Sequence, residues 1–476
     1  MKLSPSNVWI SYVNHTGMIG YLVYPNCPYG YCNPLSIPIS LTEYIGEDKQ
    51  CVFNRSGLLC GSCQPNLSLS LGSPRCLSCP NYWPVVFVSV TVAALLAGIF
   101  LVAVLLVLNM TVEVGTLNGL IFYVNIVAVN RSVLLPFREQ NFVTVFVSWL
   151  NFELGIDTCY FPGLDAYSKT WIQLSYVVVY LVFLVAFAMV IASSYSSRFT
   201  DFMRKKNTVA TISTLVFLSL VKLLEIIFVA LSLSIIDYQD GSRLKVWRPD
   251  ATVKYLQGKH IALFVTALVL FVIYLAYSTL LFSWQWLVYL PSWRILNWTR
   301  NQKLQAFTET YHTPYIIKRG YWTGMLLFVR AVLYLITAVN VSNVPQVTLV
   351  SVIFAVAFVL SVKGFVGRLY QKWPIDILET FFYFNLLALS FFACYFLDRM
   401  DEYKSVAYIS IIITFLLLVT IIVYHIFAFI VPSSIMTKLG QRVSSVLSDV
   451  HSNRKSNQED QSPPHEILDM KLQNEE

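Results

Sequence analysis

The stretch PVVFVSVTVAALLAGIFLVAVLLVL, residues 84–108, decides the fold class of this chain. It contains no charged side chain, and at ~1.5 Å per residue a helix of this length crosses the ~30 Å hydrocarbon core of a bilayer. Tyr82 and Trp83 come immediately before it, where aromatic side chains anchor a span at the headgroup boundary. The stretch therefore predicts a transmembrane helix.

Similar apolar runs recur along the chain as far as residue 431. The clear ones lie at 171–192, 209–236, 260–282, 321–339, 347–362, 377–397 and 406–431. Another apolar segment, 115–137, is interrupted by Asn125, Asn130 and Arg131, and forms either a second span or a re-entrant piece. With this segment counted, we predict an all-α integral membrane protein of about nine transmembrane helices with a small disulfide-rich extracellular cap.

The composition agrees with membrane residence. Hydrophobic residues make up 56% of the 476 residues and charged residues only 12%, about half the share found in soluble proteins. The formal net charge of +7 is modest and is explained by Lys and Arg on the cytoplasmic side of a membrane. We therefore expect the lipid bilayer as a partner, and no nucleic acid.

Three regions follow from this pattern. Residues 1–83 form the extracellular cap, 84–431 the polytopic helix bundle, and 432–476 a cytoplasmic tail. Apolar residues between Ile435 and Val450 recur at helical spacing and predict an amphipathic helix on the inner leaflet, with a frayed continuation of the last span as the alternative. The polar segment after it is expected to be disordered.

The amino terminus lacks the apolar core of an ordinary signal peptide, although the residues that follow have extracellular character. Either the first span acts as a reverse signal-anchor, or the chain is an N-terminally truncated fragment of a longer protein. We favour the fragment.

Cysteines concentrate in the cap and predict disulfide bonds. Those before the first span are Cys27, Cys32, Cys51, Cys60, Cys63, Cys76 and Cys79. Their number is odd, but Cys159 also faces outside if 115–137 spans the membrane, and the cysteines can then all pair. We expect Cys159 to bridge to the cap, and CxxC neighbours to pair elsewhere rather than with each other. Cys394 lies in an apolar run and is expected to be a packing residue.

The two CxxC pairs, 60–63 and 76–79, also fit the spacing of a zinc ribbon. Glycosylation sequons oppose zinc, because they indicate passage through the oxidising secretory lumen, where thiols form disulfides. The sequons of this region begin at Asn14, Asn54 and Asn66. We therefore expect glycans on these asparagines and no bound metal.

The distribution of Lys and Arg predicts the orientation. With the cap outside, the basic loops at 198–206, 294–319 and 363–372 fall on the cytoplasmic side, as the positive-inside rule requires. One basic loop, 243–259, would lie outside, against the rule. We expect a plasma-membrane protein with its cap outside and its C-terminus in the cytoplasm.

Two cysteine-rich segments, GLLCGSC (57–63) and GSPRCLSC (72–79), resemble the EGF-like and ephrin-receptor-like repeats of cell-surface proteins. Longer stretches are similar to a family of uncharacterised multi-pass membrane proteins from sponges and other simple animals. These stretches are VGTLNGLIFYVNIV (114–127), SWLNFELGIDTCYFPGLDAYSKTW (148–171), YHTPYIIKRGYWTGMLLFVRAVLYL (311–335) and KWPIDILETFFYFNLLALS (372–390). The resemblance covers nearly the whole chain except the tail. It implies a receptor-like cell-surface architecture and supports the fragment interpretation, but it implies no functional residues.

Charged residues inside spans are the sharpest functional indication, because each costs roughly 2.5–3.5 kcal/mol at a helix centre. Lys222 and Glu225 lie on one helix face at i,i+3, and Arg330 lies near the middle of its own span. We expect the three to form an intramembrane charge cluster in which Glu225 lies close to Arg330. Such a cluster either lines a pathway or switch, or neutralises itself and orients the helices.

Sequence motifs of catalysis are missing: there is no HExxH, no GxSxG and no phosphate-binding glycine loop. We therefore expect no enzyme, no catalytic residue and no cofactor. The first functional prediction is a receptor-like protein whose cap engages an extracellular ligand or a neighbouring cell surface. An ion channel or transporter is the alternative, and an adhesive or structural surface protein is the third. The basic loop 284–320 and the tail are candidates for contact with a cytosolic partner, and the loop also for contact with anionic lipid.

Overall fold

A computed structural model describes most of the chain. The described residues are 9–15, 18–24, 31–32, 50–135, 142–151, 158–194, 201–237, 243–287, 302–316, 319–338, 346–395 and 400–430. Cys27, residues 288–301 and 317–318 of the predicted loop 284–320, and the predicted tail 432–476 lie outside them. By compactness the chain divides within its last helix into Met1–Val419 and Thr420–Glu476, so the cap and most of the bundle belong to one unit.

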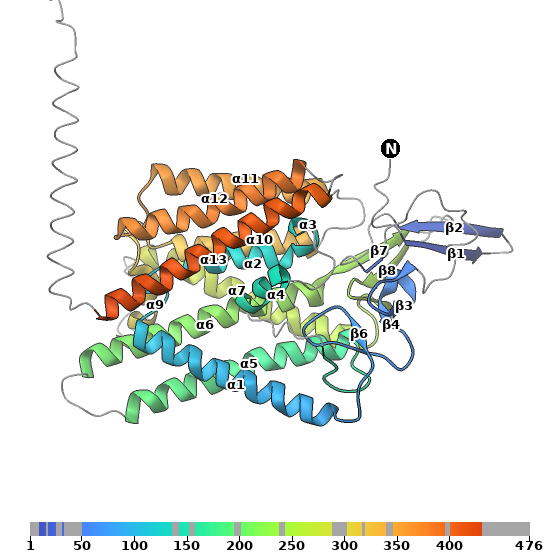
Figure 1. Ribbon diagram of the computed structural model, residues 1–476, viewed down its shortest axis with the longest axis horizontal. Coiled ribbons are helices and arrows are strands. Elements are labelled where there is room, and N and C mark those ends of the chain that lie inside the picture. The colour runs from blue at the N-terminus through green and yellow to red at the C-terminus, as the bar shows by residue number, and fades with distance from the viewer. Residues whose placement is uncertain are drawn as a thin grey trace, which may run out of the picture. The chain divides into compact units, whose positions relative to one another are not determined.

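Apolar helices dominate the described part of the chain (Figure 1). Within that part, six are long and apolar enough to cross a membrane: α1 (Trp83–Leu108), α5 (Ala166–Ser194), α6 (Asp201–Leu231), α7 (His260–Leu287), α12 (Trp373–Tyr395) and α13 (Met400–Ile430). Three further apolar helices have shorter apolar parts: α2 (Asn118–Val129), α10 (Trp322–Ala338) and α11 (Gln346–Val366). The remaining helices are η3 (Leu58–Cys60), α3 (Arg131–Leu134), α4 (Phe142–Leu150) and α9 (Gln302–His312). A membrane protein is thus supported, whereas nine full-length spans are not confirmed.

The segment 115–137 is a broken helix rather than one continuous span. Helix α2 has 12 residues, or ~18 Å of helix, which is too short for a ~30 Å hydrocarbon core. It ends at Asn130, and the short α3 follows directly. Ten of the residues of α2 are buried, because α12, α10 and α4 pack around it. Its asparagines are therefore enclosed by protein and do not face lipid.

A three-stranded antiparallel sheet occupies residues that the apolar pattern assigned to a span and its loop. The strands are β7 (Leu233–Asp237), β8 (Arg243–Trp247) and β9 (Asp250–Lys254), in the order β7-β8-β9. Helix α6 ends at Leu231, earlier than the predicted boundary at 236. Arg243 and Lys245 would be costly in lipid, and in the sheet they are register partners of Asp237 and Ile235.

The cap consists of short antiparallel pairs. These are β1 (Trp9–His15) with β2 (Met18–Tyr24), β3 (Arg55–Ser56) with β4 (Ser62–Cys63), and β5 (Ser68–Leu69) with β6 (Cys76–Leu77). Disulfides join Cys51 to Cys60, Cys63 to Cys76, and Cys79 to Cys159. Cys32 is also disulfide-bonded, and Cys394 is free. Each described CxxC cysteine thus pairs outside its own CxxC, and Cys159 reaches the cap, as the sequence predicted.

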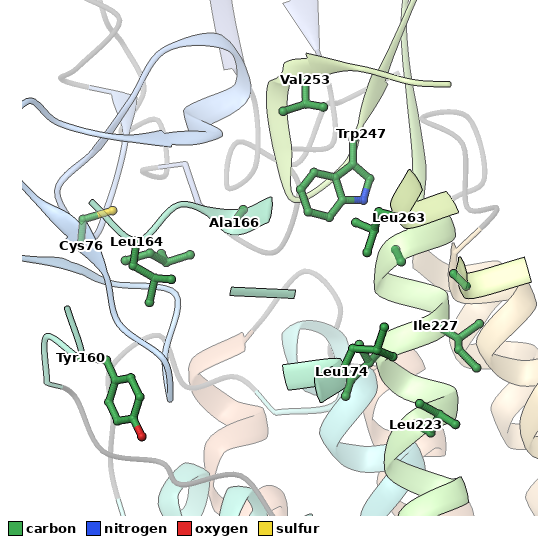
Figure 2. Packing of buried hydrophobic residues seen from close by; sticks show 14 residues of the cluster. Cys76, Tyr160, Leu164, Ala166, Leu174, Leu223, Ile227, Trp247, Val253 and Leu263 are labelled. Atoms are coloured by element: carbon green, nitrogen blue, oxygen red, sulfur yellow. The ribbon is translucent and has the colours of Figure 1, made fainter. Parts of the chain in front are cut away.

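Cap and helices share one hydrophobic core. Leu69 and Cys76 of the cap belong to the same buried cluster as Leu223 of α6, Trp247 of β8 and Leu263 of α7, part of which Figure 2 shows. A second buried cluster joins cap residues, including Leu59, to residues of the β7–β9 sheet.

Close backbone contact adds to this shared packing. A Cβ on Gly61 would lie 2.5 Å from the backbone nitrogen of Ala251, so only glycine permits the observed approach of the cap to β9. The cap therefore packs directly against α6, α7 and the β7–β9 sheet, and is not a separate domain on a linker.

Removing the Cys79–Cys159 bridge should destabilise the protein. The two cysteines are 80 residues apart, and a bridge that closes a loop of this size contributes about 4 kcal/mol in the chain-entropy model. We expect Cys159→Ala and the double change Cys79→Ala with Cys159→Ala to lower the unfolding temperature of detergent-solubilised protein by similar amounts. Cys394→Ala is the matched control and should leave the unfolding temperature unchanged. Equal stability of the Cys159→Ala variant and the control would contradict the bridge.

Candidate functional site in the helix bundle

The most unusual buried group is the guanidinium of Arg330 on α10. Arg330 has no exposed surface, and its Nε, Nη1 and Nη2 have no hydrogen-bond partner among the described residues. Its guanidinium carbon lies 5.3 Å from the ring centroid of Phe122 and 5.4 Å from that of Phe217, which are cation–π contacts. Because arginine keeps its charge in proteins, the site holds a buried positive charge whose contacts within the described residues are with aromatic faces.

Arg55 in the cap shows what a satisfied buried arginine looks like. It is 1% exposed, and its Nε donates to the carbonyl of Pro74 at 2.9 Å. Its Nη1 donates to the carbonyls of Cys60 at 2.9 Å and Gly61 at 3.1 Å. The two arginines are both almost fully buried, but among the described residues only Arg55 has hydrogen-bond acceptors, so Arg330 is the unusual one.

A buried carboxylate lies on the neighbouring helix α12. Glu379 is 3% exposed, and its Oε1 accepts hydrogen bonds from the hydroxyl of Tyr383 and, at 3.3 Å, from Nε1 of Trp322. Its Oε2 has no hydrogen-bond partner in the described part of the chain. Within the described residues, the carboxyl group of Glu379 accepts hydrogen bonds from neutral donors and forms no ion pair.

Helix α2 lies between these two buried charges. The ring of Phe122 contacts Arg330 on one side and Tyr383, at 5.6 Å between centroids, on the other. A Cβ on Gly119 would lie 2.9 Å from Cγ of Glu379, so α2 packs directly on the carboxylate's helix. A shift of α2 would therefore change the surroundings of both charges.

A hydrogen-bonded chain connects α2 to the predicted charge pair. Nδ2 of Asn125 donates to Oδ1 of Asn151 at 2.7 Å, and Nδ2 of Asn151 donates to Oε2 of Glu225 at 2.9 Å. The ammonium of Lys222 donates to the same oxygen at 2.8 Å. This series of hydrogen bonds links α2 to α6 through Asn151, the residue that follows α4. Asn151 was not singled out by the sequence, because an isolated Asn after an apolar run carries no distinctive signal.

The predicted cluster of three charges is only partly assembled. Lys222 and Glu225 form the expected pair, and their side chains are 13% and 17% exposed. Helices α6 and α10 are neighbours, as expected. The expected proximity of Glu225 and Arg330 is wrong as an ion pair, because Glu225 is occupied by Lys222 and Asn151 while Arg330 contacts aromatic rings.

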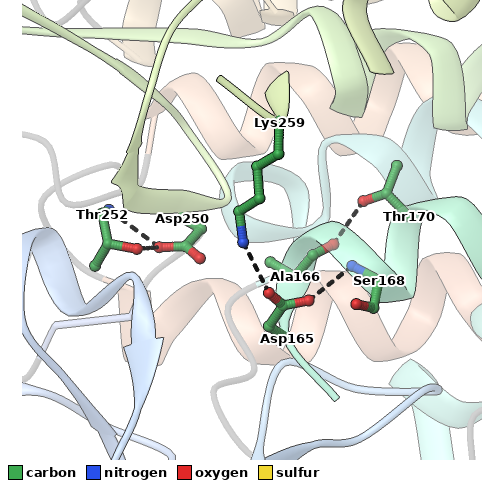
Figure 3. Close-up of polar contacts among 7 residues, drawn as sticks. All are labelled: Asp165, Ala166, Ser168, Thr170, Asp250, Thr252 and Lys259. Atoms are coloured by element: carbon green, nitrogen blue, oxygen red, sulfur yellow. Dashed lines mark hydrogen bonds and ion pairs between the residues drawn. The ribbon is translucent and has the colours of Figure 1, made fainter. Parts of the chain in front are cut away.

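A second polar group fixes the ends of α5 and α7 near the cap (Figure 3). Asp165 caps α5, since its Oδ1 accepts the backbone N–H of Ser168 at 2.7 Å, and its Oδ2 pairs with the ammonium of Lys259 at 3.1 Å. Burial raises the pKa of the Asp165 carboxyl, but the hydrogen bonds from Ser168 and the charge of Lys259 outweigh it, so the pKa lies below its ordinary value. Burial raises the pKa of nearby Asp250, although Thr252 donates two hydrogen bonds to it.

The remaining predicted site residues can be placed briefly. Asn54 and Asn66 are exposed at turns of the cap, and Asn14 lies in strand β1 opposite Ile19. In the part of the chain that the structure describes, no group of His, Cys, Asp or Glu side chains is arranged to hold a metal ion. The buried polar groups around α2 are therefore the best candidate for a functional site.

Comparisons with protein-family models, with curated proteins and with solved structures found no match. The resemblance to surface proteins of simple animals stays a prediction.

The ion pair between Lys222 and Glu225 predicts which double variants have non-additive effects on the free energy of unfolding. Glu225→Gln leaves Lys222 without its counter-charge and should cost about 3 kcal/mol, the low end for one-sided removal of a buried pair. The double change Lys222→Met with Glu225→Gln should cost clearly less than the sum of the two single changes. Thermal unfolding of the purified variants in detergent measures these values.

Glu225→Gln combined with Arg330→Met is the matched control. These residues form no ion pair or hydrogen bond with each other, so the two effects should add. Strong coupling between Glu225 and Arg330, with additivity between Lys222 and Glu225, would contradict the arrangement described above.

Proposed function

We propose that this chain is a receptor-like, multi-pass membrane protein whose cysteine-rich cap receives an extracellular ligand or a neighbouring cell surface and transmits the contact to helices α5–α7. The observation that carries the proposal is the shared core of cap and helices, in which Leu69 and Cys76 pack with residues of α6, β8 and α7. A cap that only displayed a binding surface would need no such core.

Polar contacts reinforce this coupling at the start of α5. The ammonium of Lys169 donates to the carbonyls of Ser70 and Ser73 in the cap, both at 2.8 Å. The backbone N–H of Leu69 donates to the carbonyl of Leu164 at 2.9 Å. A displacement of this part of the cap therefore moves the first turn of α5 with it.

The disulfide between Cys79 and Cys159 supports a topology in which the chain crosses the membrane nine times, with the cap outside. Cys79 precedes α1 and Cys159 precedes α5, and the disulfide between them supports our proposal that both lie at one face of the membrane. The chain between them must leave that face through α1 and return through the broken segment α2–α4. With α5, α6, α7, α10, α11, α12 and α13 crossing in turn, a cap outside the cell places the C-terminus in the cytoplasm. The plasma membrane is the location we propose.

Glycan mapping tests this orientation. Asn54 and Asn66 are exposed in the cap and should carry glycans, whereas Asn297, outside the described residues, should not, because its loop would be cytoplasmic. Asn→Gln variants at each position, compared by glycosidase treatment and electrophoretic shift, measure this. A shift lost only in the Asn297→Gln variant would overturn the orientation.

Hydrogen-exchange mass spectrometry tests the coupling itself. Binding of a cap-specific single-domain antibody should slow exchange in the cap and also in the β7–β9 sheet and the first turns of α5 and α7. In a Gly61→Ala variant, the added Cβ would separate the cap from β9, so the effect on the helices should weaken while the cap still binds. Pro65→Ala, at an exposed cap position, is the control and should behave as wild type. Slowed exchange confined to the cap would contradict the proposal.

Transport is the second candidate, favoured by the unpaired buried Arg330 beside a broken helix. Broken helices and buried charges are features of transporter binding sites. Flux or current through reconstituted vesicles that Arg330→Met abolishes would favour transport over the receptor-like function. The cytosolic partner of loop 284–320 and the tail remains part of the receptor proposal.

A further inference from the structure

The last part of α11 and the middle of α12 line an apolar groove of about 280 Å³. Its lining comes from Phe358, Ser361, Val362, Val366, Phe384 and Leu387. The two helices approach closely near its base, because Gly364 presents no side chain to Thr380. The hydroxyl of Ser361 donates to the carbonyl of Ala357 at 2.8 Å, so the lining offers no free polar group at that point.

The groove opens on the lipid-facing surface. Phe358 is 51% exposed, Phe384 53% and Val366 84%, although all three lie in apolar helices of a membrane protein. Side chains of this kind on a membrane helix contact acyl chains. Nearby Trp373 is 50% exposed at the start of α12, where an aromatic side chain marks the headgroup boundary.

Positive charge surrounds the end of the groove. Lys363, Arg368 and Lys372 are exposed at the end of α11 and in the turn to α12. Arg319 joins them, since its Nη1 donates to the carbonyl of Arg368. The ammonium groups of Lys363 and Lys372 have no ion-pair or hydrogen-bond partner among the described residues.

The nearest acid cannot balance these four cations. Asp376 directs Oδ1 to the backbone N–H groups of Leu369 at 2.8 Å and Tyr370 at 2.9 Å. Its carboxylate therefore fixes the turn from within, and at most one of the four positive charges is neutralised.

We propose that this groove and its basic end form a binding site for an anionic phospholipid, with one acyl chain along α11 and α12 and the headgroup phosphate at Lys363 and Lys372. The groove alone would not select a ligand, because the surrounding acyl chains are as apolar as its lining. The unbalanced charge supplies the selection, since basic residues at a membrane surface attract anionic headgroups. The site is independent of the receptor-like function proposed above.

Native mass spectrometry of the full chain in detergent, titrated with dioleoyl phosphatidylglycerol or dioleoyl phosphatidylcholine, tests the site. The double change Lys363→Gln with Lys372→Gln should reduce the preference for phosphatidylglycerol about thirtyfold, since each basic residue at the surface contributes about 1 kcal/mol. The double change Lys245→Gln with Lys254→Gln removes the same charge from the exposed face of the β7–β9 sheet and should leave the preference unchanged.

A second pair of variants tests the groove. Val362→Trp fills it and should lower retention of phosphatidylglycerol, whereas Val179→Trp, at a lipid-facing position of α5, should not. Glycerophosphoglycerol, which has the headgroup without the chains, should fail to displace the bound lipid. An unchanged preference in the Lys363/Lys372 variant, full retention in the Val362→Trp variant, or displacement by glycerophosphoglycerol would each overturn the proposal.

Discussion

The disulfide between Cys79 and Cys159 is the constraint on which the bundle's arrangement depends. It fixes the start of α1 and the segment before α5 to each other, so the chain between them has to leave and return. The return segment is built from short helices, of which α2 has 12 residues and α4 has 9. A broken helix at membrane depth is tolerated only where protein covers it, because exposed backbone groups find no hydrogen bonds in lipid. The burial of α2 by three neighbouring helices follows from this requirement.

Breaks in the return segment also explain where the polar side chains lie. Asn130, at the end of α2, donates from Nδ2 to the carbonyl of Ile126 at 3.0 Å, and so occupies a backbone acceptor near the break. Asn125 and Asn151 form the next contact and reach the Lys222–Glu225 pair. These contacts supply part of the hydrogen bonding that a buried polar network needs, although Oδ1 of Asn125 and Oε2 of Glu379 have no partner among the described residues. The guanidinium of Arg330 makes no hydrogen bond within the described residues, because its aromatic neighbours provide no acceptor.

The sequence was sufficient to predict a membrane protein and a disulfide from Cys159 to the cap. It was not sufficient to predict where every helix ends or which buried side chains meet. Apolar length identified α1, α5, α7 and α13, because a lipid-facing helix must be apolar along its whole length. The odd count of cap cysteines pointed to Cys159, because an unpaired thiol is unfavourable in an oxidising compartment. Both inferences use only the types and positions of residues in the sequence and need no knowledge of tertiary contacts.

Other features depended on tertiary contacts and could not be read from pattern alone. The end of α6 was misplaced because Leu233–Ile236 is apolar enough to continue a helix, and only pairing with β8 makes it a strand. The expected contact between Glu225 and Arg330 assumed that opposite charges at similar depth must meet. The assumption failed because Lys222 and Asn151, the residue that follows α4, both bond to Oε2 of Glu225.

Helix α2 contacts the residues on which both proposed functions depend. Force on the cap reaches α6 through Trp247, whose Nε1 donates to the carbonyl of Val229 at 3.0 Å. From α6 the contacts continue through Glu225 and Asn151 to Asn125 of α2. On its other faces α2 touches Arg330 through Phe122 and Glu379 through Gly119. The proposed receptor-like function and the proposed transport function would therefore both involve the surroundings of the same short helix, because α2 contacts the residues on which each proposal rests.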